Sequence, residues 1–368
     1  MNFFFWQNIV SIHQCSFLES LAVTNQVILI VDEEIEVKRK SHGWIVPEIK
    51  NVQIIVRLQE DYVDEILKNN FDAFHFFSGI EIYPLATLAL KKSVKLSMPN
   101  IGVLLEPFNN KGFVGALRSL KYRFLILKYK RKIRILYPTG FLGRKCYENL
   151  GFPTEKIFDW GYFTESITTD YKLAEFSKST KSNLLFVGSI DKRKNILDIV
   201  SKIKKYESKY NEFIIVGSGE LESELQELIV GCGNISFRGG LQNAEVKLLM
   251  RKSDILILPS LFDGWGAVIN EALQAGMQVI ASENCGASIL LDGEYRGEVF
   301  SFDGINVFDE VMGKWLEKDP LTVEKRMEIA KWSTDHISGE VAASYFESVI
   351  NFTLGNELAR PVAPWLKK

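Results

Sequence analysis

The chain has 368 residues, of which 46% are hydrophobic and 24% charged, and its 44 basic and 46 acidic residues leave a net charge of −2. This is the composition of a folded globular protein, so disordered, collagen-like and coiled-coil chains are excluded, and ~100–200 residues per domain predicts two domains. Because the charges nearly balance, binding to nucleic acid or anionic lipid would require a local basic patch.

The four cysteines and four histidines are scattered and form no Cys-x-x-Cys or His-x-x-x-His pair. We therefore expect neither a zinc site nor a disulfide framework, and reduced thiols of a cytoplasmic protein fit best. The first 18 residues carry no charged side chain. They lack a basic leader region and are interrupted by polar residues, so we interpret them as a buried strand rather than a signal peptide. No run reaches the ~20 apolar residues that span a bilayer.

Short apolar runs recur along the chain and alternate with segments of helical spacing such as 61–69 and 83–92. The first series predicts strands at 3–6, 27–31, 52–56, 73–77, 101–105 and 133–136. A second series follows a polar, linker-like segment at 172–182 and predicts strands at 183–187, 212–216, 235–237, 255–258, 278–281 and 298–300. The alternation indicates an α/β fold with two doubly wound parallel sheets in tandem, with a boundary near 165–182.

The polar and glycine-rich motifs lie in the loops that follow the strands of the second series. Doubly wound sheets bind their ligands at such loops. The most informative is PSLFDGWG, followed by a helix-forming segment at 267–276. Gly264 and Gly266 permit an irregular loop, so we expect Asp263 just before the helix and Glu271 one turn inside it, with both carboxylates facing one cleft. Carboxylates there can accept hydrogen bonds from sugar hydroxyls. A capping Asp263 and a solvated Glu271 are the alternative, which the apolar flanking residues disfavour.

PSLFDGWGAVINEALQAG, preceded by VGSIDKRK and GSGE, resembles the C-terminal half of the family 4 retaining glycosyltransferases of the GT-B fold. These are group 1 glycosyl transferases, of the type that makes bacterial surface polysaccharides such as lipopolysaccharide and capsule. The resemblance covers about residues 183–350, whereas the N-terminal half matches only in element order. It implies two Rossmann-like domains facing a cleft: an acceptor-binding domain at 1–165 and a nucleotide-sugar-binding domain at 166–340. A helix within 341–368 would return to the first domain.

The resemblance also assigns roles to the two acids. The family has a Glu-x7-Glu motif, matched here by Asp263 and Glu271, which implies that Glu271 binds the nucleotide ribose and Asp263 the donor sugar. Trp265 would join Gly264 and Gly266 in lining the donor site. Aspartate at the first position is a departure that shortens the side chain by one methylene, and it leaves the donor sugar open.

The loop GSIDKRKN places three cations at a strand-to-helix turn. Cations there can stabilise the charge that develops on a nucleotide-diphosphate leaving group without a metal ion. The family has Lys at the position of Lys194 and often Arg where this chain has Ser189. Arg193 is the candidate to replace that missing charge, and Gly188 opens the turn. A solvated helix start is the alternative for the cations.

Two further glycine motifs allow more than one interpretation. In GSGE, a dinucleotide fingerprint would need Gly or Ala three residues after Gly219, but Glu222 stands there. We therefore interpret Gly217 and Gly219 as a tight turn near the nucleotide. Gly286 and Ala287 resemble the family's loop beside the diphosphate, where backbone N–H groups can form an anion nest. A purely structural turn fits these two residues nearly as well.

The first domain offers weaker candidates. We expect His75 to point into the cleft as a catalytic residue, and His13, in the loop after the first strand, and Glu106 to contact the acceptor. Histidines without a catalytic task fit the sequence equally well.

Residues 111–145 contain eleven cations and no acid, interleaved with aromatic and aliphatic residues. This composition is typical of a helix at an anionic membrane surface. The cations of this predicted membrane patch are Arg118, Lys121, Arg123, Lys128, Lys130, Arg131 and Lys132. The alternatives are a solvated helix face over an ordinary core, or a nucleic-acid contact, which no recognised binding module supports.

Together these features predict a retaining hexosyltransferase that moves a sugar from a UDP- or GDP-linked donor to a glycan or lipid-linked acceptor. We expect no metal and no separate cofactor, no nucleic-acid partner, and a peripheral position on the inner face of the cytoplasmic membrane. The alternatives are an inactive GT-B partner protein, which the Ser189 and Asp263 departures allow, a nucleotide-sugar epimerase, and an NAD-dependent oxidoreductase, which Glu222 disfavours.

Overall fold

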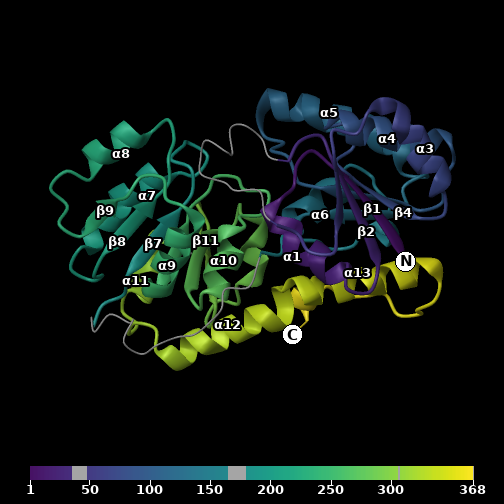
Figure 1. Cartoon of the computed structure of the whole chain (residues 1–368). Coiled ribbons are helices and arrows are strands. Elements are labelled where there is room, and N and C mark those ends of the chain that lie inside the picture. Colours follow the sequence, from purple (N-terminus) through teal and green to yellow (C-terminus); the bar gives the residue numbers. More distant parts are fainter. Residues whose placement is uncertain (35–47, 165–179, 306, 368) are drawn as a thin grey trace. The chain divides into compact units, whose positions relative to one another are not determined.

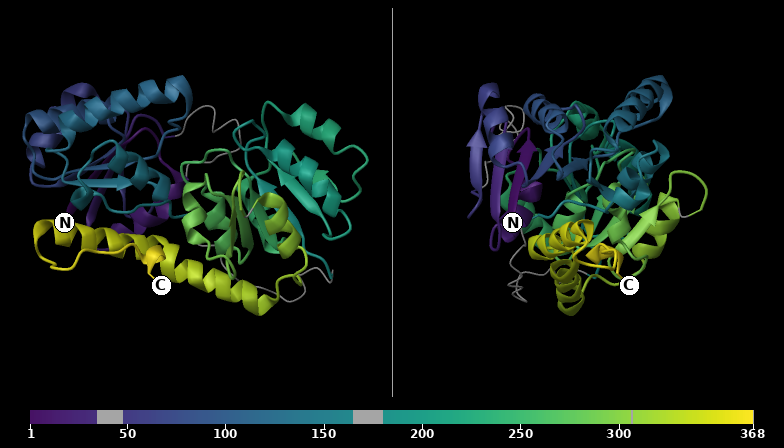
Figure 2. Two further views of the ribbon diagram at one scale, coloured as in Figure 1. Left: turned by 180° about the vertical axis from the view of Figure 1, so that it is seen from behind. Right: turned by 90° about the vertical axis from the view of Figure 1, so that its right-hand side faces the viewer.

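The computed structural model describes residues 1–34, 48–164, 180–305 and 307–367, and these form two compact α/β units. The first unit contains the described residues up to 164 and from 337 onward, and the second contains those from 180 to 336. Figures 1 and 2 show the helices and strands of each unit.

The first unit is built on six parallel strands in the order β3-β2-β1-β4-β5-β6. The strands are β1 (Asn2–Gln7), β2 (Gln26–Val31), β3 (Gln53–Val56), β4 (Phe74–Ser78), β5 (Ile101–Leu105) and β6 (Ile135–Pro138). The helices are α1 (Ile12–Leu21), α3 (Glu60–Asn69), α4 (Pro84–Lys95), α5 (Gly112–Tyr129), α6 (Gly140–Asn149) and α13 (Gly339–Leu354), with short 3₁₀ turns η1 (Thr154–Lys156) and η5 (Pro364–Leu366).

Helices cover both faces of this sheet, and one of the two faces carries helices from both ends of the chain. Side chains of α3, α4 and α5 pack on one face, among them Leu67, Leu90 and Ile126. On the other face α13 lies alongside α1 (Figures 1 and 2), and the tilted rings of Phe346 and Phe76 pack with 4.8 Å between their centroids. The C-terminal helix therefore completes the core of the first unit.

The second unit repeats the strand order, as β12-β11-β10-β7-β8-β9. Its strands are β7 (Leu184–Val187), β8 (Phe213–Val216), β9 (Ile235–Phe237), β10 (Ile255–Leu258), β11 (Gln278–Ser282) and β12 (Gly297–Phe300). Its helices are α7 (Ile196–Ile203), α8 (Glu222–Leu228), α9 (Asn243–Lys252), α10 (Val268–Gln274), α11 (Phe308–Trp315) and α12 (Val323–Ile337), with 3₁₀ turns η3 (Lys204–Tyr206) and η4 (Gly286–Leu290).

Both sheets have one point where the strand order reverses, between β1 and β4 in the first and between β7 and β10 in the second. There the loops after neighbouring strands lead to opposite faces, which leaves a crevice at the carboxyl ends of the strands. All the predicted strands are found, with ends shifted by at most two residues. The predicted α/β fold with two doubly wound parallel sheets is confirmed. Most of the expected linker at 172–182 lies outside the described residues.

Candidate functional site

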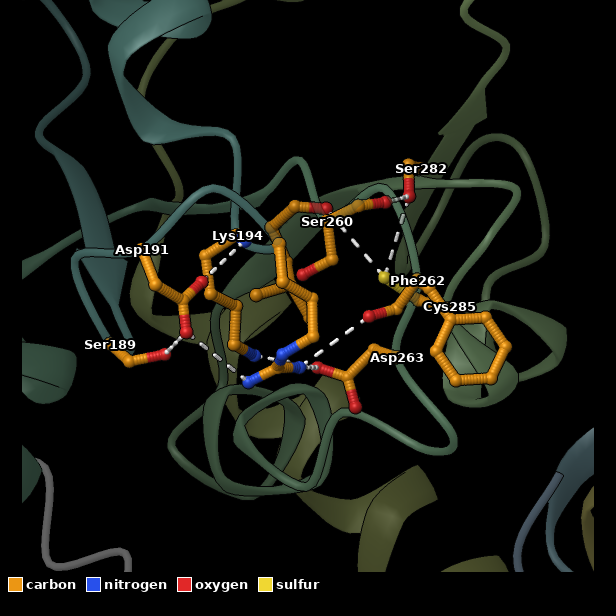
Figure 3. A network of polar contacts seen from close by, with 10 residues as sticks. Ser189, Asp191, Lys194, Ser260, Phe262, Asp263, Ser282 and Cys285 are labelled. Atoms are coloured by element: carbon orange, nitrogen blue, oxygen red, sulfur yellow. Dashed lines mark hydrogen bonds and ion pairs between the residues drawn. The ribbon is translucent and has the colours of Figure 1, made fainter. Parts of the chain in front are cut away.

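An ion pair between Lys194 and Asp263 joins the loops after β7 and β10 at the reversal point of the second sheet. Lys194 lies at the end of the loop after β7, and its Nζ is 2.5 Å from Oδ2 of Asp263 in the loop after β10 (Figure 3). The two side chains are only 10% and 14% exposed. Both residues were predicted to belong to the site, and they are 69 positions apart in the sequence. They meet where a doubly wound sheet binds its ligand.

The loop after β7 is shaped by Asp191, which the sequence did not single out. Its carboxylate accepts hydrogen bonds from the Ser189 hydroxyl at 2.7 Å and from the backbone N–H of Lys194 at 2.8 Å. The next residue, Asn195, takes a left-handed conformation with φ of 56° before α7 begins. Ser189 thus holds the loop rather than presenting a charge. The spacing Ser-x-Asp before a helix, typical of turns closed by short polar side chains, was the signal available for Asp191.

Arg193 adds a second cation beside the pair. Its guanidinium donates to the Phe262 carbonyl at 3.4 Å and lies 3.6 Å from the Asp263 carboxylate and 3.8 Å from that of Asp191. Unlike Lys194, its side chain is about half exposed, at 47%. It can therefore turn toward an anionic ligand without leaving a buried charge uncompensated.

Backbone hydrogen bonds join the loop after β10 to the loop after β11. The N–H of Gly286 donates to the carbonyl of Asp263 at 3.0 Å, and the N–H of Ala287 donates to that of Trp265 at 2.8 Å. Both N–H groups donate to carbonyl oxygens of the protein, so the predicted anion nest at Gly286 and Ala287 is wrong. The alternative interpretation, a purely structural turn, agrees with these contacts. A Cβ at Gly286 would lie 2.1 Å from the Gly264 carbonyl oxygen, so only glycine allows this approach.

Trp265 also differs from its prediction as a donor-lining residue. Its side chain is 2% exposed, and its indole N–H donates to the Asn270 side chain at 2.7 Å. The buried indole therefore anchors the loop to the core. Gly266, with φ of +89°, makes the turn that leads into α10. In the same network the hydroxyl of Ser282 donates to the Ser260 carbonyl at 2.5 Å (Figure 3).

The GSG turn after β8 packs directly on the loop after β7. A Cβ at Gly217 would lie 1.7 Å from the Gly188 carbonyl oxygen, and one at Gly219 would lie 2.4 Å from that of Ile190. The side chain of Glu222 accepts the N–H of Gly219 at 2.7 Å. A carboxylate therefore fills the helix-terminal position where a dinucleotide fold binds its pyrophosphate.

Glu271 lies in the first turn of α10, as predicted, and is partly buried. Burial raises the pKa of this carboxyl to about 7, with Lys247 acting in the opposite direction. Within the described residues no hydrogen bond to its carboxylate is formed. A shielded carboxyl of this kind can accept hydrogen bonds from ligand hydroxyls.

His75 is a core residue, so its predicted catalytic position in the cleft is wrong. It is fully buried near the start of β4, away from the carboxyl end of the strand. Its Nδ1 accepts the Trp6 indole N–H at 3.2 Å, and its Nε2 lies 3.0 Å from the Asn70 carbonyl oxygen, which fixes the neutral form with the proton on Nε2. Burial accordingly lowers its pKa to about 4.

The two acceptor candidates share a partner that the sequence did not indicate. His13 lies in the first turn of α1 rather than in the preceding loop, and its ring stacks on Tyr162 at 5.1 Å between centroids. The Tyr162 hydroxyl donates to the carboxylate of Glu106, which directly follows β5. Both candidates thus follow strands of the first sheet at its carboxyl edge, and their acceptor role stays a prediction.

Most of the predicted membrane patch lies on or just after α5. Arg118, Lys121, Arg123, Arg131 and Lys132 are exposed. Lys128 differs, because it forms an ion pair with Glu81 at 2.8 Å. Its side chain is nevertheless 55% exposed, so its place in the patch stays a prediction. Lys130 is half-buried at the end of the helix.

Among the described residues, no helix has both the length and the hydrophobicity needed to span a bilayer. Nor do three or more of their His, Cys, Asp and Glu side chains gather where they could hold a metal ion.

Comparison with known proteins supports the fold and the class of the second unit. Residues 169–334 match the family described as glycosyl transferases group 1. In structure the chain resembles Anabaena HepE in complex with UDP, with a TM-score of 0.71 and 12% identity over 96% of this chain and 100% of that one. The fold is GT-B, as predicted, and the matches support a group 1 glycosyltransferase.

Sequence relatives are distant. An uncharacterized glycosyltransferase of Methanocaldococcus jannaschii is 25% identical over 44% of each chain, so the alignment spans less than half of that relative's length. An uncharacterized protein in the cps region of Klebsiella pneumoniae is 26% identical over 73% of this chain and 77% of its own. The O-antigen chain mannosyltransferase of Salmonella typhimurium is 28% identical over 45% of this chain and 47% of its own.

Proposed function

We propose that the protein is a retaining hexosyltransferase that uses a UDP- or GDP-linked sugar as donor and a glycan or lipid-linked acceptor in polysaccharide biosynthesis. The observation that carries the proposal is the Lys194–Asp263 pair at the reversal point of the second sheet, with Arg193 beside it. Cations and a carboxylate in one shielded place suit a ligand that is anionic at one end and rich in hydroxyls at the other.

In this proposal each residue has a distinct task. Lys194 and Arg193 bind the diphosphate and stabilise the charge that grows on it as the bond to the anomeric carbon breaks. Asp263 then accepts a hydrogen bond from a sugar hydroxyl, and Glu271 accepts those of the ribose. The acceptor oxygen bonds to the anomeric carbon on the face that the diphosphate leaves, and its proton passes to the departing phosphate oxygen.

The polysaccharide context is supported by what two relatives are called. One is an O-antigen chain mannosyltransferase and the other is encoded in a cps region. In this proposal the growing glycan is held on a lipid at the inner face of the cytoplasmic membrane, where the basic residues of and after α5 contact anionic headgroups.

The test is a transfer assay with UDP-glucose, UDP-galactose and GDP-mannose and a panel of lipid-linked glycans. We expect nucleoside diphosphate release that depends on acceptor, and a product whose anomeric configuration, measured by NMR, matches that of the donor. Lys194→Ala should lower turnover by about 10²-fold or more. Conversion of the donor sugar without transfer would indicate an epimerase, and absence of both turnover and nucleotide binding would indicate an inactive partner protein.

A further inference from the structure

The outward face of α5 is apolar, although it takes no part in the core of the first unit. Phe113 and Phe124 are 79% and 64% exposed, and Leu117, Leu120 and Leu127 are each more than half exposed. At ~100° per residue these five positions lie within about 80° of one another around the helix axis. We refer to Phe113, Leu117, Leu120, Phe124 and Leu127 as the α5 stripe.

The opposite face of the same helix already provides the packing that holds it. Tyr122, Ile126 and Tyr129 are buried against the sheet, and a Cβ at Gly115 would lie 2.2 Å from the backbone of Asn110. In Figure 1, α5 forms the outer layer of the first unit together with α3 and α4. A helix with a buried face normally turns a polar face to water, so the α5 stripe has no role in folding.

Cations flank the stripe on both sides. Lys121 lies on one edge and Arg123 on the other, and α5 has no acidic residue. Arg131 and Lys132 follow just beyond the end of the helix. In the described part of the chain Lys121, Arg123, Arg131 and Lys132 form no ion pair, in contrast to Lys128.

We infer that the α5 stripe enters the acyl-chain boundary of an anionic bilayer, with α5 lying in the membrane plane and its flanking cations at the lipid phosphates. The inference rests on the membrane position in the proposed function and adds the apolar contact to it. An anionic lipid surface matches both the apolar centre and the positive edges of this face. Pairing of two copies through the stripe would bring their cations together and is disfavoured by like-charge repulsion.

The test is vesicle flotation of the full chain with matched variants. Leu120→Ser/Phe124→Ser removes the centre of the stripe, and Lys121→Gln/Arg123→Gln removes the flanking charges. Val230→Ser/Leu248→Ser is the control, because these side chains are 79% and 54% exposed on the second unit. All replaced side chains are exposed, so unchanged melting temperatures should show that the variants fold.

We expect the wild type and the control to float with phosphatidylglycerol-containing vesicles and much less with pure phosphatidylcholine. Loss of the two stripe residues should lower the partition coefficient at least about tenfold, and loss of the two charges should lower it mainly for anionic vesicles.

If the stripe variant floats like the wild type while the charge variant does not, insertion is wrong and the electrostatic contact of the proposed function stands. If the wild type does not bind vesicles at all, both fail. A wild-type dimer in light scattering that becomes a monomer in the stripe variant, without vesicle binding, would assign the stripe to a second copy and overturn the inference.

Discussion

The contact between Lys194 and Asp263 is short and mostly shielded from water. Removing one partner of such a pair leaves the other charge uncompensated, whereas removing both does not. We therefore expect Asp263→Ala to lower the free energy of unfolding of the second unit by about 1–3 kcal/mol. Lys194→Met combined with Asp263→Ala should lower it by less than the sum of the single changes. Urea unfolding of the four proteins measures this coupling, and strict additivity would contradict a direct interaction.

Glu271 provides a pH-dependent test of the donor site. Its pKa of about 7 lies above the ordinary value of 4.5, so the folded protein holds this proton more tightly than the unfolded chain. Stability from this group is therefore present below pH 4.5 and is lost as the pH rises through 7. Glu271→Gln should gain stability over the wild type at pH 8 but little at pH 5. A gain of equal size at both pH values would show that burial does not shift this carboxyl.

The same titration should affect nucleotide binding. If the ionised carboxylate accepts ribose hydroxyls, the affinity for UDP or GDP rises between pH 6 and pH 8 in the wild type and stays nearly flat in Glu271→Gln. Isothermal titration calorimetry at three pH values measures the difference. Parallel profiles in the two proteins would argue against ribose binding by Glu271.

The sequence indicated Lys194 and Asp263 as separate site residues, but it predicted neither the contact between them nor the burial of their neighbours. Lys194 and Asp263 could be found because each follows a strand at the edge where ligands bind. Trp265 and His75 also stand beside such motifs or strands, yet their side chains turn into the core. Whether a side chain faces a site or the core depends on packing between segments distant in the chain, such as Trp6 against His75, and periodicity alone does not determine that.

At the scale of elements, the turn after β8 has a specific steric requirement. Gly217 has φ of +147°, and a Cβ there would collide with the Gly188 carbonyl oxygen. Gly217→Ala must therefore displace the loop that carries Lys194. We expect the variant to melt several degrees lower and to lose most of its nucleotide-induced stabilisation. Gly233→Ala is the matched control, because a Cβ at Gly233 meets nothing within 4 Å, and a similar response in both variants would contradict the account.

The strands were predictable because parallel strands buried on both faces appear as short continuous apolar runs. Helix surroundings were harder to predict. The interleaved apolar and basic residues of α5 indicated an amphipathic segment, but only the fold shows that Tyr122 and Ile126 face the core while Phe124 faces outward. Similarly, the sequence does not reveal that the backbone N–H groups of Gly286 and Ala287 donate to carbonyl oxygens in the loop after β10. These hydrogen bonds leave neither N–H group available for an anion.

At the scale of the whole molecule, two sheets with the same strand order follow one another in the chain, and the last helix belongs to the first of them. Among the residues that the structure describes, only the second unit has an ion pair that joins the loops on the two sides of its reversal point. This asymmetry is the reason for assigning the donor nucleotide to the second unit, and the assignment predicts which ligands stabilise the protein.

The most direct measurement is thermal stabilisation of the full chain by UDP, GDP, ADP and NAD, with Lys194→Met and Glu271→Ala beside the wild type. A ligand present at 100 times its dissociation constant adds about 2.7 kcal/mol to stability. The account predicts that UDP or GDP raises the melting temperature of the wild type and that both variants lose this increase, while NAD has no effect. A folded wild type that none of the nucleotides stabilises, or that NAD alone stabilises, would contradict the assignment of a sugar-nucleotide site to the second unit.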